Sequence, residues 1–125
     1  MNNQYWVVGA MWEGQIDKLP DFIKGGYWYL GYSREEDAAQ NQKRDGMRVG
    51  DRLAVKRMLG QGSSEIEIRA LGIIKHIDDE DGYKRVYVNW VAEGLARRVP
   101  SKGCYKSVHG PFEPDDEWTR QVFCL

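Results

Sequence analysis

The sequence predicts an α+β domain: a small curled β-sheet or pseudo-barrel of five or six strands with two or three short helices. Its 125 residues are enough for one domain, residues 1–125, and for a core that needs no disulfides. Most apolar residues fall in short runs that suit strands and are separated by glycine-rich or charged turns. Helical spacing is confined to two short segments near the N-terminus, so we expect strands that are mostly hairpin neighbours.

The N-terminal half begins with a dense apolar run, residues 5–10, which predicts a buried first strand followed by a loop over 11–15. Asp17 can cap a short helix whose apolar positions share one face and which ends at Gly25 and Gly26. The aromatic run 27–32 is too short for a helix. Ser33 to Glu36 form a capping box, which predicts a polar helix over about 35–44 that buries only two alanines and lies on the surface.

The rest of the chain is predicted to form mainly strands. Residues 52–59 alternate like a half-buried strand, 65–74 enter the core, and an acidic turn over 78–82 leads back into a strand over 83–91. Residues 97–100 predict an edge strand and 111–118 a loop or helical turn. Residues 119–125 predict a last strand.

Charge and hydropathy exclude several classes of protein. Eighteen basic and nineteen acidic residues give a net charge of −1, which excludes a uniformly basic nucleic-acid coat. No apolar run approaches the ~20 residues of a membrane helix, and the first residues do not resemble a signal peptide. We therefore expect a soluble, cytoplasmic protein that does not associate with membranes, with Cys104 and Cys124 as free thiols.

Signals for catalysis are sparse. The two histidines, His76 and His109, lack the spacing of a metal site, and there is no phosphate-binding loop, dinucleotide fingerprint or nucleophile elbow. Cys104 has no identifiable base partner in the sequence. The sequence therefore predicts a protein that is not an enzyme and has no cofactor and no metal.

The clearest functional signal is aromatic. The chain contains fifteen aromatic residues, five of them tryptophan. Trp6, Trp90 and Trp118 are expected to be structural, whereas Trp12 and Trp28 lie in turn-like contexts beside glycines. For these two the alternatives are core packing or a stacking surface for a flat base, which contributes ~1–3 kcal/mol per base.

Basic residues gather in the C-terminal half. Residues 83–106 include six basic residues and one acidic residue. Together with two basic residues of the 52–59 strand, they are a candidate patch for binding phosphates. The alternative is an ordinary solvated face. The predicted backbone-contacting residues are Lys56, Arg57, Lys84, Arg85, Arg97, Arg98 and Lys102.

Three short motifs occur in a characteristic order: Gly-Ala-x-Trp at 9–12, Gly-x-Trp-x-x-Gly-Tyr at 26–32, and Gly-Asp-Arg-x-Ala-x-Lys at 50–56. With these motifs the sequence resembles the PUA-like superfamily, in particular its EVE and YTH branches. It is most similar to the N-terminal domains that precede AAA+ GTPase modules in McrB-type modification-dependent restriction proteins. The resemblance covers residues 5–91 and weakens towards the C-terminus.

The resemblance implies an aromatic cage for an extruded, modified base. By this analogy Trp28 is the cage tryptophan, Met11 and Trp12 line the wall and floor, Tyr29 offers backbone groups to the base edge, and Tyr32 closes the rim. YTH domains bring a second cage tryptophan from a long loop where this chain has the acidic turn. Another residue such as Trp12 must then supply the second wall, or the ligand differs from methyladenine.

We therefore expect a non-catalytic domain that reads a modified, methylated base in DNA by flipping it into an aromatic pocket. It would target a restriction or defence effector, and its partners would be modified DNA and a fused or associated AAA+ GTPase with a nuclease subunit. The chain would be the N-terminal part of such a protein or a free-standing relative. The alternatives are a PUA-like RNA-binding module and a protein-interaction domain whose rings form a hot-spot patch.

Overall fold

The computed structural model of this chain describes residues 3–12, 15–31, 36–60, 62–78 and 84–125. Within these residues the chain forms nine strands and three helices. The strands are β1 (Tyr5–Gly9), β2 (Met11–Trp12), β3 (Ile16–Asp17), β4 (Tyr27–Tyr29), β5 (Arg52–Met58), β6 (Glu65–Asp78), β7 (Arg85–Ala92), β8 (Arg97–Pro100) and β9 (Val108–Phe112). The helices are α1 (Leu19–Gly25), α2 (Ala38–Asp45) and α3 (Glu117–Phe123).

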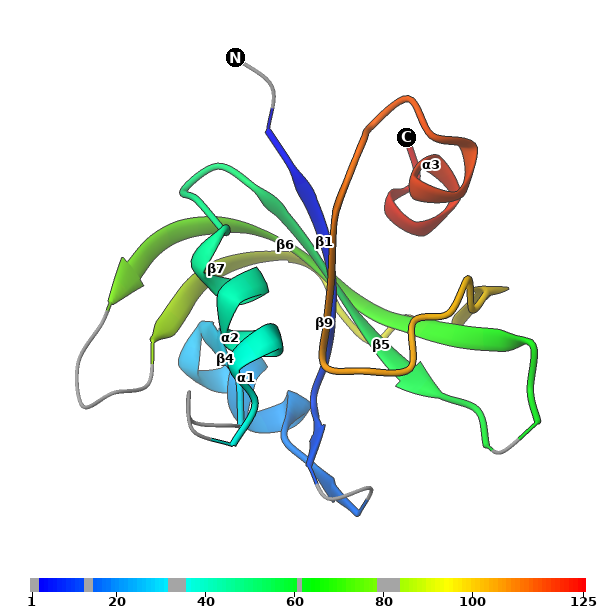
Figure 1. Cartoon of the computed structure of the whole chain (residues 1–125), viewed down its shortest axis with the longest axis horizontal. Coiled ribbons are helices and arrows are strands. Elements are labelled where there is room, and N and C mark those ends of the chain that lie inside the picture. Colours follow the sequence, from blue (N-terminus) through cyan, green and yellow to red (C-terminus); the bar gives the residue numbers. More distant parts are fainter. Residues whose placement is uncertain (1–2, 13–14, 32–35, 61, 79–83) are drawn as a thin grey trace.

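One curled sheet organises the fold. Six of its strands follow the order β4-β7-β6-β5-β1-β9, and β8 pairs with the first part of the long strand β6. β1 and β5 are parallel, whereas the other pairs are antiparallel. Figure 1 shows β6 arching across the molecule, with α1 and α2 on one side of the sheet and α3 on the other. The predicted α+β class with a curled sheet and short helices is confirmed.

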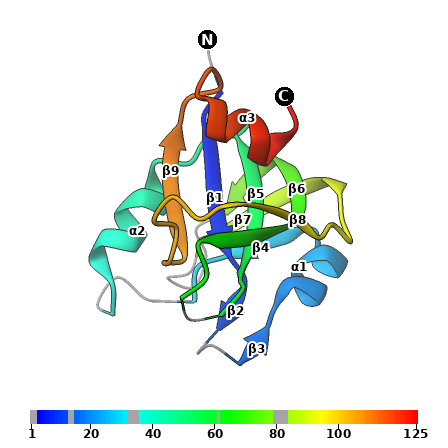
Figure 2. The ribbon, with the colours of Figure 1, turned by 90° about the vertical axis from the view of Figure 1, so that its right-hand side faces the viewer.

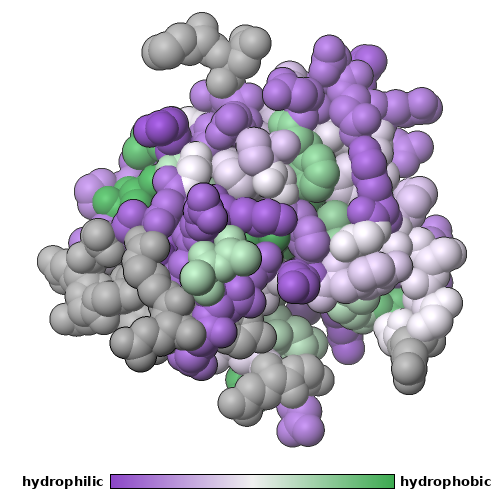
Figure 3. All heavy atoms as spheres, in the orientation of Figure 1, coloured by the Kyte–Doolittle hydropathy of each residue, from purple (hydrophilic) through white to green (hydrophobic). Residues whose placement is uncertain are grey.

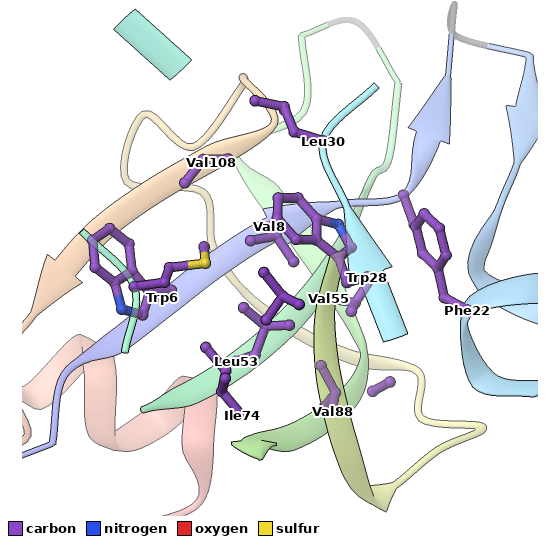
Figure 4. Packing of buried hydrophobic residues seen from close by; sticks show 14 of the residues in the cluster. Trp6, Val8, Phe22, Trp28, Leu30, Leu53, Val55, Ile74, Val88 and Val108 are labelled. Carbon is purple, nitrogen blue, oxygen red and sulfur yellow. The ribbon is translucent and has the colours of Figure 1, made fainter. Parts of the chain in front are cut away.

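The alternation of side chains along β1 separates two cores. Trp6 and Val8 face the larger core, which contains Phe22 and Trp28 and lies on the side of α1 and α2 (Figure 4). Val7 faces the smaller core, which α3 and β8 close. Because both faces of β1 are covered, its predicted continuous apolar run is explained by burial on two sides.

The first helix agrees with its sequence signals. The N-cap position is Lys18, one residue later than predicted and without a side-chain cap, but the Asp17 carboxylate still accepts a hydrogen bond from the Leu19 N–H at 3.0 Å, and Pro20 lies in the first turn. Gly26 closes the helix in the left-handed conformation, with φ of 73°. The second helix differs from its prediction. It begins later, because Asp37 provides the cap by accepting the Gln40 N–H, and Ser33 of the predicted capping box lies outside the described residues.

The buried face of α2 is also different from the prediction. Its two alanines are exposed, and it buries Gln40, Asn41 and Arg44 instead. The Gln40 side-chain oxygen accepts the Val108 N–H of β9 at 2.6 Å. A hydrogen bond to the sheet edge, rather than an apolar stripe, therefore positions this helix.

The predicted last strand over 119–125 is wrong, because this segment forms α3. Asp116 accepts hydrogen bonds from both the backbone N–H and the hydroxyl of Thr119 and so caps the helix. Trp118 and Val122, four residues apart, bury the same face. The last strand of the sheet is β9, in a segment that was expected to be partly loop. Figure 2 shows α3 at the end of the molecule beside the C-terminus.

No helix within the described part of the chain is both long enough and apolar enough to cross a membrane. The face seen in Figure 1 is largely hydrophilic, with scattered hydrophobic spots (Figure 3). Scattered apolar groups of this kind are ordinary on a protein surface.

Candidate functional site

A small cavity lies where the chain leaves β1, between the Gly9–Trp12 segment and the Trp28–Gly31 segment. Its volume is about 110 Å³. One water needs ~10–15 Å³ on the same kind of measure, and typical small-molecule sites begin near ~300 Å³. The cavity therefore has room for one ring-sized group. Its lining residues are Gly9, Met11, Trp12, Trp28, Tyr29, Leu30, Gly31, Glu36 and Ser107.

The structure brings together four of the five residues expected to form a base pocket, namely Met11, Trp12, Trp28 and Tyr29. Tyr32, the fifth, lies outside the described residues. The cavity forms because the curl of the sheet brings β4 to the end of β1, where the Trp28 indole N–H donates to the Gly9 carbonyl.

Trp28 differs from the expectation of an open stacking wall. Its side chain has no exposed surface, and its indole N–H donates to the Gly9 carbonyl at 2.9 Å. Figure 4 shows the ring in the core cluster that also contains Val8 and Val55. An indole on β4 faces the core because the sheet curls over it. Trp28 therefore supports the cavity from the core.

Trp12 and Tyr29 are the partly exposed rings of the cavity. They meet edge to face, with ring centroids 5.3 Å apart. Gly31 lies against the Trp12 ring so closely that a Cβ there would be 2.9 Å from it, and the Lys18 ammonium lies 4.9 Å from the ring centroid. Trp12 is therefore held in place from several sides, although it is not part of the main core.

A wider cleft of about 710 Å³ adjoins the cavity and shares Gly9, Met11 and Ser107 with it. The Gly9 N–H donates to the Ser107 carbonyl at 2.9 Å, which places the 105–107 segment beside the end of β1, where both hollows lie. The remaining residues of this cleft are Asp37, Gln40, Lys56, Arg57, Met58, Gly60, Tyr105 and Lys106.

Among the residues that the structure describes, three cations and one carboxylate line this cleft. Lys56, Arg57 and Lys106 supply the positive charge, and the carboxylate of Asp37 is engaged in capping α2. Ring nitrogen Nε2 of His109 accepts the Lys106 N–H at 2.9 Å. Burial, together with the charges of Lys56 and Lys43, lowers the pKa of His109 to about 4. The neighbourhood of the cleft is therefore electropositive even though the whole protein is slightly acidic.

The expected basic patch does not form as one surface. Arg97 lies opposite Ile68 and Arg85 lies opposite Asp78, ten residues apart along β6. At ~3.3 Å per residue this corresponds to about 33 Å of strand, so the two basic pairs of the predicted patch lie at opposite ends of it. A run of basic residues in sequence is split because β7 and β8 pair with different halves of one long strand.

Most of these basic side chains have structural partners. The Lys84 ammonium contacts the Asp45 carboxylate at 3.0 Å, and Arg85 lies over the rings of Tyr27 and Tyr29. Arg97 donates to the carbonyls of Gln121 and Val122 near the end of α3. Lys102 pairs with Asp116 at 3.2 Å, and Arg98 is exposed on β8. Of the predicted backbone contacts, only Lys56 and Arg57 line the cleft beside the cavity.

Sequence reasoning did not place Gly9, Gln40, Tyr105 and Ser107 at the site, and it did not put Lys106 beside the first strand. No local signal indicates these positions, because they meet only through the pairing of β9 with β1. Within the described residues, no group of three His, Cys, Asp or Glu side chains is placed to hold a metal ion.

Comparison with protein-family models, with curated proteins and with solved structures finds no match for this chain.

Proposed function

We propose that this domain is a non-catalytic reader of a modified, methylated base in DNA, which it takes in extruded form. The observation that carries the proposal is that the aromatic cavity and the cationic cleft are neighbours, with Gly9, Met11 and Ser107 in the lining of both. A flipped nucleotide needs a pocket for its ring and an adjoining positive surface for its phosphates.

In this proposal the base enters beside Trp12 and Tyr29, whose partly exposed rings offer stacking or edge contacts. Trp28 acts from the core by supporting the cavity. In the described part of the lining, Glu36 and Ser107 carry polar side chains, as do the Trp12 indole and the Tyr29 phenol, so hydrogen bonds to the edge of a base can come from this set. An apolar wall discriminates one added methyl group by only ~1–3 kcal/mol, so the preference for a modified base would be moderate.

The sequence motifs support the same assignment. The curled sheet is compatible with the PUA-like pseudo-barrel that the resemblance implies, and two of the three motifs, those at 9–12 and 26–32, contribute to the cavity. We extend the proposal to the biological role: the domain directs a fused or associated AAA+ GTPase and nuclease to modified DNA.

A titration tests the proposal directly. Labelled duplexes that differ only in one methylated cytosine or adenine are titrated with the wild type, Trp12→Ala and the control Tyr87→Ala, whose ring lies on β7 outside the cavity. We expect wild type and control to prefer a modified duplex by about tenfold, and Trp12→Ala to lose the preference. Equal affinity of the wild type for all duplexes would reject the proposal.

The alternatives are outcomes of the same titration. Tighter binding to RNA hairpins than to any DNA would indicate the RNA-binding alternative. An absence of binding to every nucleic acid at low salt would indicate a protein-interaction domain, because phosphate contacts are strongest under that condition.

A further inference from the structure

Lys56 is a buried cation. Only 6% of its surface is exposed, although it lies on β5 at the wall of the cleft. Lysine is rarely buried without a partner of opposite charge, because removing an ammonium group from water is costly. Its ammonium contacts the Met58 sulfur at 3.7 Å, and within the described part of the chain it forms no salt bridge with a carboxylate.

The thiol of Cys104 does not replace the missing anion. Burial raises the pKa of Cys104 above its ordinary value, against the opposing influence of Lys56, Lys102 and Lys43, so the group is a neutral thiol at pH 7. Burial in turn lowers the pKa of Lys56. A buried lysine at the wall of a cleft, with its pKa shifted by burial, is a feature that clusters at functional sites.

The space around this ammonium group suits an anion. Gly9 lies opposite Lys56 in the β1–β5 pair, and a Cβ at Gly9 would be 3.7 Å from the Lys56 nitrogen. Because Gly9 has no side chain, it leaves unfilled the space beside this nitrogen at the residue that lines both the cavity and the cleft. Arg57 and Lys106 line the same cleft, so an anion at this position would be near two more cations.

We propose that Lys56 anchors the phosphate of the nucleotide whose base enters the cavity. The inference rests on the proposed function and specifies its ligand as a phosphodiester-linked nucleotide rather than a free base. Gly9 lines both the cavity and the cleft, so a ring in one and a phosphate at Lys56 can belong to one nucleotide. Lys56 then sets the register of the extruded base, and the preference for modification stays with the cavity.

The experiment pairs a protein change with a phosphate change. Duplexes carrying the modified base receive one uncharged methylphosphonate at each linkage near that base in turn. They are titrated with the wild type, with Lys56→Met, which keeps the length of the side chain without its charge, and with the control Lys75→Met, an exposed lysine on β6.

We expect the wild type and Lys75→Met to lose about tenfold or more in affinity at one linkage. Lys56→Met should bind the unaltered duplex about 10- to 100-fold more weakly, with no further loss at that linkage and a salt slope reduced by about one. Unaltered affinity of Lys56→Met, or an undiminished penalty at the same linkage, would overturn the inference.

Two further measurements separate the possible failures. Thermal unfolding establishes that Lys56→Met is folded, and Lys56→Gln provides a second uncharged variant with the same expected loss. A wild type that prefers modified DNA while Lys56→Met loses nothing rejects the phosphate site alone. A wild type without that preference rejects the proposed function, and a wild type that binds no DNA rejects both. Binding of inorganic phosphate without the linkage effect would indicate a free-anion site and also reject the inference.

Discussion

Asp51 allows a quantitative test of how the motif at 50–56 acts. Its side chain is 3% exposed and accepts three hydrogen bonds, from the Gln4 N–H at 3.0 Å, the Trp6 indole N–H at 2.9 Å and the Arg48 N–H at 3.0 Å. It therefore connects the beginning of β1, the first core tryptophan and the turn before β5. The structure gives this motif residue a role in stability.

Replacing Asp51 by alanine leaves three donors without an acceptor. Each buried donor without a partner costs ~1–3 kcal/mol, and entry of water offsets part of the sum, so we expect a loss of about 3–5 kcal/mol in the free energy of unfolding. Urea unfolding followed by tryptophan fluorescence measures this loss. Asp116→Ala is the matched control, because it removes a helix cap at a more exposed position and should therefore cost clearly less.

A double-mutant cycle sharpens the test. Trp6→Phe removes the indole donor, and its coupling to Asp51→Ala should be about 1–2 kcal/mol, because the two changes remove the same hydrogen bond. If Asp51→Ala destabilises the protein no more than Asp116→Ala, the reasoning from unsatisfied donors is refuted.

Three further predictions concern the cavity and the cleft. Lys56→Met should be more stable than wild type at pH 7. Because burial lowers the pKa of Lys56, the unfolded chain binds more protons than the folded protein between the folded pKa and 10.5, so the stability of the wild type rises with pH in this window. The stability difference between Lys56→Met and wild type should therefore be smaller at pH 10 than at pH 7, as unfolding curves at the two pH values can measure. The pKa of His109 is about 4 in the folded protein against an ordinary value of 6.5, so the free energy of unfolding of the wild type should fall by on the order of 2 kcal/mol as the pH decreases through this window. His109→Gln should remove this loss, whereas the exposed control His76→Gln should not. Unfolding curves at several pH values would measure the difference. Gly31→Ala places a Cβ 2.9 Å from the Trp12 ring, so it should lower the free energy of unfolding by about 1–3 kcal/mol. It should also reduce the preference for modified over unmodified duplex without weakening binding to the unmodified duplex. An unchanged preference would contradict the role of Trp12.

Local signals predicted those elements whose stability depends on neighbouring residues. The strand of Trp6 and Val7, the helix that Asp17 and Gly26 delimit, and the strands of the central hairpin all carry their pattern within a few residues. Part of the cavity lining, Met11, Trp12, Trp28 and Tyr29, was also expected from the family resemblance, whereas Gly9, Glu36 and Ser107 were not.

The same local signals failed where distant contacts decide the outcome. Residues 119–125 have strand-forming composition, but the Asp116 cap and the burial of Trp118 with Val122 favour a helix. Arg97 and Lys84 lie in one basic stretch of sequence, yet pairing with different halves of β6 separates them. Neither result can be predicted from a window of a few residues.

The sequence by itself determined the α+β class and the main strands, because hydrophobic periodicity and turn chemistry act over short distances. The resemblance to a known family added the expectation that Trp12 and Trp28 lie at one pocket. Only the tertiary structure decided that Trp28 is enclosed in the core, that Lys56 is buried with its charge, and that Ser107 lies beside Gly9. Burial and electrostatic environment depend on which segments the curled sheet brings together. These contacts span about 20 to 100 residues of chain, beyond the range of any local pattern.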